Sequence, residues 1–168
     1  PLKIQVVTDY GALDLFFNMT QEGPNKIVGT NPNYGVNFEA FIKDNGRVHV
    51  SMSSDKAYKY RLLFDAKNKK LDNGQIRHYS VLTKDVKTIE VGDDNEVDGN
   101  VNWVGTDFNF HLFALVFPKE TPARYKTTEA GQMYVEIPNA ANTFAADLVF
   151  TKKNYDELIS LGDNLHLS

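Results

Sequence analysis

The chain contains no cysteine and no excess of basic residues. Without a thiol it forms no disulfide framework and offers no thiolate as a nucleophile or metal ligand. Its 22 acidic residues outnumber its 18 basic residues, which gives a formal net charge of -4. Because proteins that bind nucleic acid usually carry a basic patch, this balance predicts that nucleic acid is not a partner.

A long hydrophobic run is also missing. No stretch reaches the roughly 18 consecutive apolar residues that a membrane-spanning helix needs. The sequence starts at Pro1 rather than at a methionine, and it shows no signal peptide. We therefore expect a mature segment or a domain excised from a longer protein, in which case the missing part would hold any membrane segments.

Aromatic residues, in contrast, are plentiful: the chain has 11 Phe and 8 Tyr, which favours β-structure. The clearest pattern runs from Phe108 to Val116, where every second residue is apolar, the period of a β-strand. Pro118 lacks an amide hydrogen and should end this strand. We expect a central strand covered on both faces near its end, with a core formed by Trp103, Phe108, Phe110 and Leu112.

Similar alternation elsewhere predicts about ten strands. Asp44-Asn45-Gly46 reads as a hairpin turn, residues 53–56 as a break between two strands, and residues 65–74 and 119–131 as polar loops. No period of 20 to 50 residues repeats, which disfavours a propeller or solenoid. The expected fold is all-β, a two-sheet antiparallel sandwich over residues 1–151.

Residues 152–168 are expected to form a separate C-terminal unit with one short α-helix. Asn154 can cap the helix, Glu157 lies where a capping box needs it, and Gly162 can end it. An apolar stripe follows near helical spacing, formed by Tyr155, Leu158, Ile159 and Leu165. A helix of about two turns is unstable alone in water, so the stripe should dock on the sandwich or on another part of the protein.

No catalytic motif stands out. The four histidines (His49, His78, His111 and His166) lack the spacing of a metal site, and neither a nucleophile elbow nor a phosphate-binding loop is present. The acidic run at residues 92–100 lacks the spacing of a calcium loop and reads as a solvated loop. We expect no catalytic residue, no metal and no cofactor.

Two weaker possibilities remain open at this point. Strand carboxylates can meet in a fold and hydrolyse a glycoside, although outward-facing solvated charges are the more common case. The candidates are Asp14, Glu39, Glu90, Asp107, Glu136 and Asp147. Tyrosines in or near loops can also form a sugar-binding platform, and these are Tyr10, Tyr34, Tyr79 and Tyr125.

Two segments carry a family resemblance. Residues 101–105 (Val-Asn-Trp-Val-Gly) followed by the aromatic residues 108–118, and the ending 148–165 with Asn-Tyr-Asp-Glu-Leu-Ile-Ser-Leu-Gly, resemble the large periplasmic domain of the bacterial YidC membrane protein insertase. The two segments occur in the family's order and spacing. Thr151-Lys152-Lys153 replaces the family's usual Gly-Pro-Lys, Asn109-Phe110 replaces Tyr-Phe, and the first hundred residues match only loosely.

The resemblance implies a β-supersandwich followed by a short helix, located in the periplasm as part of a bacterial inner-membrane protein. It implies a non-catalytic accessory domain that contacts the Sec translocon or nascent membrane proteins. Tyr155, Leu158, Ile159 and Leu161 would then dock the terminal helix, and transmembrane segments outside this sequence would hold the protein in the membrane. The alternatives are a carbohydrate-binding module and a mutarotase-like or glycosidic enzyme.

Overall fold

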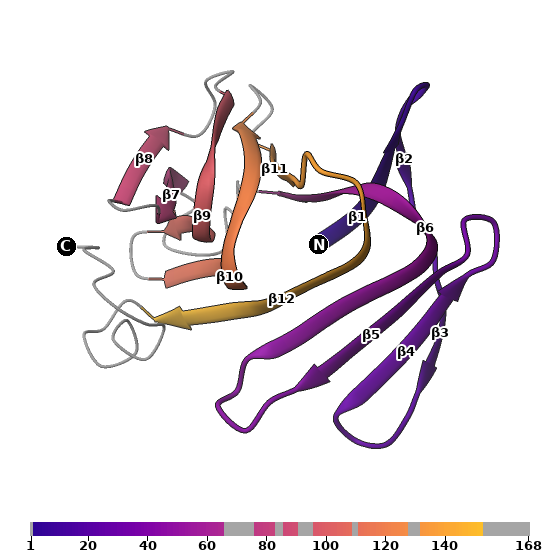
Figure 1. Ribbon diagram of the computed structural model, residues 1–168. Coiled ribbons are helices and arrows are strands. Elements are labelled where there is room, and N and C mark those ends of the chain that lie inside the picture. Colours follow the sequence, from indigo (N-terminus) through magenta and orange to yellow (C-terminus); the bar gives the residue numbers. More distant parts are fainter. Residues whose placement is uncertain are drawn as a thin grey trace.

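The computed structural model describes residues 2–65, 76–82, 86–90, 96–108, 111–127 and 132–152 (Figure 1). These residues form twelve β-strands and no helix, so the all-β prediction is confirmed for the part that is described. The predicted helix, with Tyr155, Leu158, Ile159 and Leu161, lies outside the described residues, and so does Phe110.

The twelve strands are numbered in chain order. They are β1 (Leu2–Thr8), β2 (Gly11–Asp14), β3 (Asn18–Gln21), β4 (Lys26–Asn31), β5 (Val36–Ile42), β6 (Val48–Asp65), β7 (Ile76–Leu82), β8 (Val86–Glu90), β9 (Glu96–Phe108), β10 (His111–Thr127), β11 (Gln132–Glu136) and β12 (Ala141–Lys152).

Two long strands organise the sheet. All pairs are antiparallel, and the order along the main path is β3-β4-β5-β6-β11-β10-β9-β7-β8. The first half of β6 lies between β5 and β12, and its second half lies between β1 and β11. The first half of β10 pairs with β12 and its second half with β11, while β9 follows both halves. Each long strand therefore passes from one set of partners to another, and Figure 1 shows β6 curving as it does so.

The core lies on the inward faces of these strands. Side chains facing inward on neighbouring strands form rows, for example Phe38, Met52 and Phe144 on β5, β6 and β12. The same hydrophobic cluster includes Tyr60 and Leu62 in the second half of β6 and Val6 on the neighbouring strand β1. Because strand side chains alternate between faces, this cluster uses every second residue, as the sequence pattern predicted.

The predicted central strand is in fact two strands. β9 ends at Phe108 and β10 begins at His111, and the two pair with Leu112 opposite Asp107 and Phe113 opposite Thr106. The apolar alternation from Phe108 to Val116 therefore continues across a chain reversal, which a period of two cannot reveal. Trp103 lies in β9 and is buried at 2% exposure, in agreement with its predicted core position. Phe108 and Leu112 are placed by their backbones at the ends of β9 and β10.

Pro118 does not end its strand, so the prediction of a loop from residue 119 is wrong. β10 continues to Thr127, while residues 128–131 lie outside the described part. Pro118 cannot donate a backbone hydrogen bond, and the pairing of β10 with β9 is irregular around it, between Val116 and Thr121.

The predicted break at residues 53–56 is also wrong, since β6 runs through it from Val48 to Asp65. Polar contacts compensate for the polar sequence there. The Asn142 amide donates to the carbonyl oxygens of Ser54 and Asp55 at 3.1 and 2.8 Å, and the Ser54 hydroxyl donates to the carbonyl oxygen of Lys56 at 2.6 Å. The predicted turn at 44–46 is confirmed, with Gly46 at a φ of 81°.

Candidate functional site

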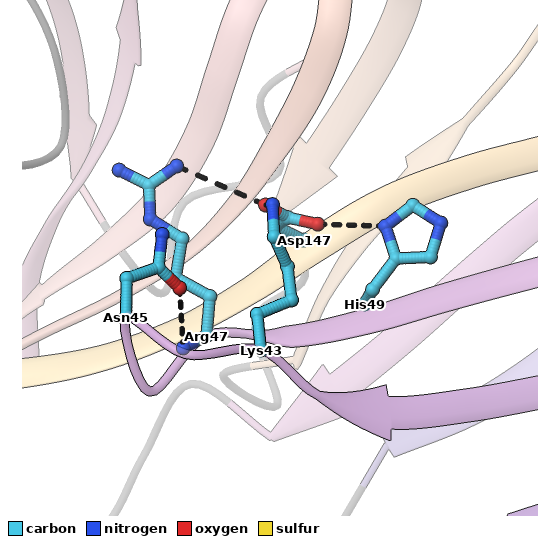
Figure 2. Close-up of polar contacts among 5 residues, drawn as sticks. All are labelled: Lys43, Asn45, Arg47, His49 and Asp147. Carbon is cyan, nitrogen blue, oxygen red and sulfur yellow. Dashed lines mark hydrogen bonds and ion pairs between the residues drawn. The ribbon is translucent and has the colours of Figure 1, made fainter. Parts of the chain in front are cut away.

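Among the described residues, one buried carboxylate is surrounded by a lysine, an arginine and a histidine. Asp147 on β12 lies opposite His49 on β6. The Lys43 ammonium donates to Oδ2 of Asp147 at 2.8 Å, and Nδ1 of His49 lies 2.8 Å from Oδ1. Figure 2 shows Arg47 on the remaining side, with Nη1 at 3.8 Å from Oδ2. We call these four residues the Asp147 cluster.

Two of the basic side chains, those of Lys43 and Arg47, lie in the turn between β5 and β6. The Lys43 amide donates to the Arg47 carbonyl oxygen at 2.8 Å, and the Gly46 amide donates back to the Lys43 carbonyl oxygen at 2.9 Å. The Asn45 side chain accepts a hydrogen bond from the Arg47 amide at 3.1 Å. This tight turn places Lys43 and Arg47 beside the same carboxylate, whereas His49 lies on β6, the strand that follows the turn.

Burial and hydrogen bonding act on Asp147 in opposite directions. The residue is only 9% exposed, and burial alone would raise its pKa. Hydrogen bonds and charge from Lys43 and His49 outweigh this effect and hold the pKa of Asp147 below its ordinary value of 3.8. The carboxylate is therefore ionised at neutral pH, and its neighbours compensate for its desolvation.

The His49–Asp147 contact fixes the orientation of the imidazole. When Nδ1 carries the hydrogen and donates it to Oδ1, the other ring nitrogen becomes the acceptor. The same arrangement positions the general base of many hydrolases. Here, however, an ammonium also bonds the carboxylate directly, so the geometry also fits a cluster whose task is to neutralise a buried charge.

A second buried carboxylate lies on β11, beside the second half of β6. Glu136 on β11 is 6% exposed and lies opposite Arg61. Its Oε1 accepts a hydrogen bond from Nη2 of Arg61 at 3.0 Å, and Oε2 is 3.6 Å from Nη1 of Arg124. Arg124 also reaches Asp98 at 2.7 Å, and the Arg61 guanidinium lies 4.3 Å above the ring of Tyr134. We call this group the Glu136 cluster.

The other sequence candidates are scattered. Asp14 contacts Gln5 and Lys3, and Glu39 contacts Lys26. The expectation of solvated outward charges is therefore wrong for Glu136 and Asp147, which are buried. The side chains of Glu90, Asp107, His78 and His111 lie outside the described residues, as does His166.

The proposed tyrosine platform does not assemble from its described members. Tyr10 is 96% exposed at the β1–β2 turn, but Tyr125 lies in β10 and is buried at 1%. Burial raises the pKa of Tyr125 to about 12. Tyr34 is partly buried and meets Tyr58 edge to face, with ring centroids 6.1 Å apart. The side chain of Tyr79 lies outside the described part.

Two concave surfaces flank the N-terminal strands. A groove of about 590 Å³ crosses β3, β4, β5, β6 and β12 and is lined by several small polar side chains, among them Asn18, Thr20, Asn37 and Ser51. A cleft of about 440 Å³ is mostly apolar. Its lining includes Ile4, Leu15, Phe16, Phe17, Met19 and Phe38. Neither surface contains His49 or Glu136, so the charged clusters and the cavities are separate.

Comparison with known proteins adds no identification. No known family model matches the chain, and no curated protein shows significant similarity to it. Within the described ranges, His, Asp and Glu side chains form no group of three or more that could hold a metal ion. The described residues likewise include no helix whose length and apolar character would let it cross a membrane.

Proposed function

We propose that this chain is a non-catalytic interaction domain of a bacterial membrane protein insertase, a β-supersandwich with a short C-terminal helix on the periplasmic side. The observation that carries the proposal is the placement of the two segments that resemble the family. β12 ends against the start of β10, with Phe150 opposite Phe113 and Lys152 opposite His111. The first segment and the described start of the second, residues 148–152, thus pair in one part of the sheet.

Packing at Gly105 supports the family resemblance of the first segment, which begins with residues 101–105. A Cβ atom added to Gly105 would lie 2.7 Å from the Phe113 carbonyl oxygen and 3.0 Å from the Trp103 ring. Real Cβ atoms do not approach backbone oxygen so closely, so glycine is required where β9 and β10 meet. The Trp-Val-Gly sequence therefore forms a packing unit with β10, which a chance run of apolar residues would not need.

Accessible aromatic side chains are available for protein contacts. Phe150, two residues before the end of β12, is 56% exposed, and Tyr10 at the β1–β2 turn is 96% exposed. In the proposed role, the Sec translocon or a nascent membrane protein would contact the chain near Phe150. The residues after β12, including Tyr155, Leu158, Ile159 and Leu161, would lead toward the membrane-embedded part.

Site-specific photocrosslinking tests this function. The chain carries a photoreactive phenylalanine analogue at Phe150, or at exposed Lys56 as a matched control, and is mixed with proteoliposomes that contain the Sec translocon with or without a stalled membrane protein. We expect crosslinks to translocon or substrate from position 150 and few from position 56. Equal labelling from both positions, or none, would contradict the proposal. Selective binding to a glycan array would favour the carbohydrate-binding alternative instead.

A further inference from the structure

The strand β3 forms an open edge of the sheet. Among the described residues it pairs only with β4, and its four residues (Asn18, Met19, Thr20 and Gln21) are all exposed. Proteins usually protect such edges with charged side chains, proline or a bulge. β3 contains no charged residue and no proline, and its pairing with β4 is regular. Apart from its shortness, this edge is therefore open to an additional strand.

The hydrogen-bonding direction of β3 follows from the adjoining turn. The Glu22 amide donates to the Lys26 carbonyl oxygen at 2.9 Å. In an antiparallel ladder, bonded and non-bonded pairs alternate, so Thr20 and Asn18 bond toward β4. The amide hydrogens and carbonyl oxygens of Met19 and Gln21 then point away from the sheet. These four groups can pair with a new strand without disturbing β4.

The two faces of β3 differ in character. Met19 lines the apolar cleft together with Phe16, Phe17 and Phe38. Asn18 and Thr20 line the larger groove on the opposite face. Because strand side chains alternate, an added strand should carry apolar residues at every second position, on the side of Met19.

Charge near the Gln21 end of β3 favours one position for a cation on the partner. At the Gln21 end, Lys26 contacts both Glu22 and Glu39 at 3.5 Å, so two carboxylates share one ammonium and leave a net charge of -1. Lys3 and Asp14, which line the apolar cleft together with Met19, are 3.9 Å apart and balance each other. A cationic residue on the partner is therefore favoured beside Glu22. In an antiparallel pairing this position precedes the first apolar residue.

We propose that β3 binds an extended segment of a partner polypeptide as an added antiparallel strand, in which a lysine or arginine precedes alternating apolar and polar residues. Backbone hydrogen bonds to Met19 and Gln21 supply affinity, and the cleft beside Met19 selects the apolar positions. The inference deepens the proposed interaction role and rests on it only for the source of the partner.

A labelled peptide, Lys-Val-Thr-Val-Thr-Val-Ser with blocked ends, tests the inference by fluorescence anisotropy. Gln21→Pro removes one outward amide hydrogen and leaves the bonds of Thr20 to β4, whereas Gln21→Ala removes the same side chain and keeps the amide. We expect Gln21→Pro to weaken binding at least about tenfold and Gln21→Ala to leave it within about twofold. A peptide with glutamate in place of lysine should bind about threefold more weakly at low salt.

A measurement on the unaltered protein covers the case in which Gln21→Pro fails to fold. Amide hydrogen exchange followed by NMR should show that the peptide slows exchange at Met19 and Gln21, while Asn18 and Thr20 change little. Failure of the peptide to bind, equal affinity of the Gln21→Pro and Gln21→Ala variants, or protection elsewhere would overturn the inference. A dimer that Gln21→Pro dissociates, without peptide binding, would also overturn it, because the edge would then bind a second copy of the chain.

The two tests fail independently. Peptide binding at β3 with no crosslinks from Phe150 would refute the insertase role and keep the edge site. Crosslinks from Phe150 without peptide binding would have the opposite meaning.

Discussion

The two buried carboxylates occupy equivalent positions at opposite ends of β6. Asp147 lies directly across from His49 near the start of the strand, and Glu136 lies directly across from Arg61 near its end. In both cases a strand from the C-terminal part of the chain contributes the acid, and β6 contributes a basic side chain. Opposite charges facing each other across neighbouring strands stabilise the pairing and help fix its register.

The partners of the two acids differ in kind. Glu136 is bound by two guanidinium groups, from Arg61 and Arg124, and arginine remains charged at every pH at which proteins are folded. Asp147 is bound by the Lys43 ammonium and the His49 imidazole, each at 2.8 Å, and the Arg47 guanidinium lies farther away at 3.8 Å. The comparison teaches that the same cross-strand arrangement can be built with two guanidinium groups at one end of β6 and with a mixed set of basic side chains at the other.

The largest effect is expected for Glu136→Leu. Removal of the carboxylate leaves Arg61, whose side chain is 22% exposed, without its main partner and with its Nε already lacking a hydrogen bond. We expect the free energy of unfolding to fall by about 3 kcal/mol, measured by urea denaturation. In the double variant Arg61→Met/Glu136→Leu most of the loss should return, because no buried charge is left alone. An equal loss in single and double variants would show that the ion pair is not the cause.

A smaller effect that depends on pH is expected for Asp147→Asn. Because the folded-state pKa of Asp147 is depressed below 3.8, its stabilising contribution is present above the pKa of the unfolded chain and is lost as pH falls through the folded value. The variant should therefore be less stable than the parent by about 1–2 kcal/mol at pH 7. As pH falls below the folded-state pKa of Asp147, the two should converge. Denaturation curves at a series of pH values measure this difference, and a gap that stays constant with pH would contradict the assignment.

The smallest effect is expected for His49→Gln. The lysine still bonds Oδ2 of Asp147 at 2.8 Å, and a glutamine amide can donate to Oδ1 in place of the imidazole. We expect a loss of about 0.5–1 kcal/mol at pH 7, measured by thermal denaturation. Lys43→Met, which removes the ammonium and keeps the aliphatic stem, should cost more. The reverse order would mean that the histidine carries the cluster.

Local pattern identified many of the strands but not their partners. Alternation predicted about ten strands, and the described residues form twelve. The same pattern merged the end of β9 with the start of β10, because alternation can stay in phase across a tight reversal. It also missed β3, whose residues Asn, Met, Thr and Gln show no apolar period and whose stability comes from pairing with β4.

The charged clusters were beyond the reach of local pattern. Asp147 and His49 are separated by 98 positions, and Glu136 and Arg61 by 75, so each pair forms only after the fold brings β11 and β12 to β6. On a strand, an acidic residue between apolar neighbours reads as an outward, solvated group. The one local hint was the cationic turn of Lys43 and Arg47 just before His49, which indicates an acidic partner but cannot name it.

The position of β6 has a consequence for how the chain matures. β6 is complete at Asp65, whereas β11 and β12, which cover one of its edges, begin only at Gln132 and Ala141. During synthesis from the N-terminus, that edge stays without its native partner until more than half of the remaining chain has left the ribosome. Pairings between such distant segments form slowly, and until they form the unpaired strand edge makes the folding intermediate prone to aggregate. We therefore expect this domain to depend on chaperones more than other domains of its size.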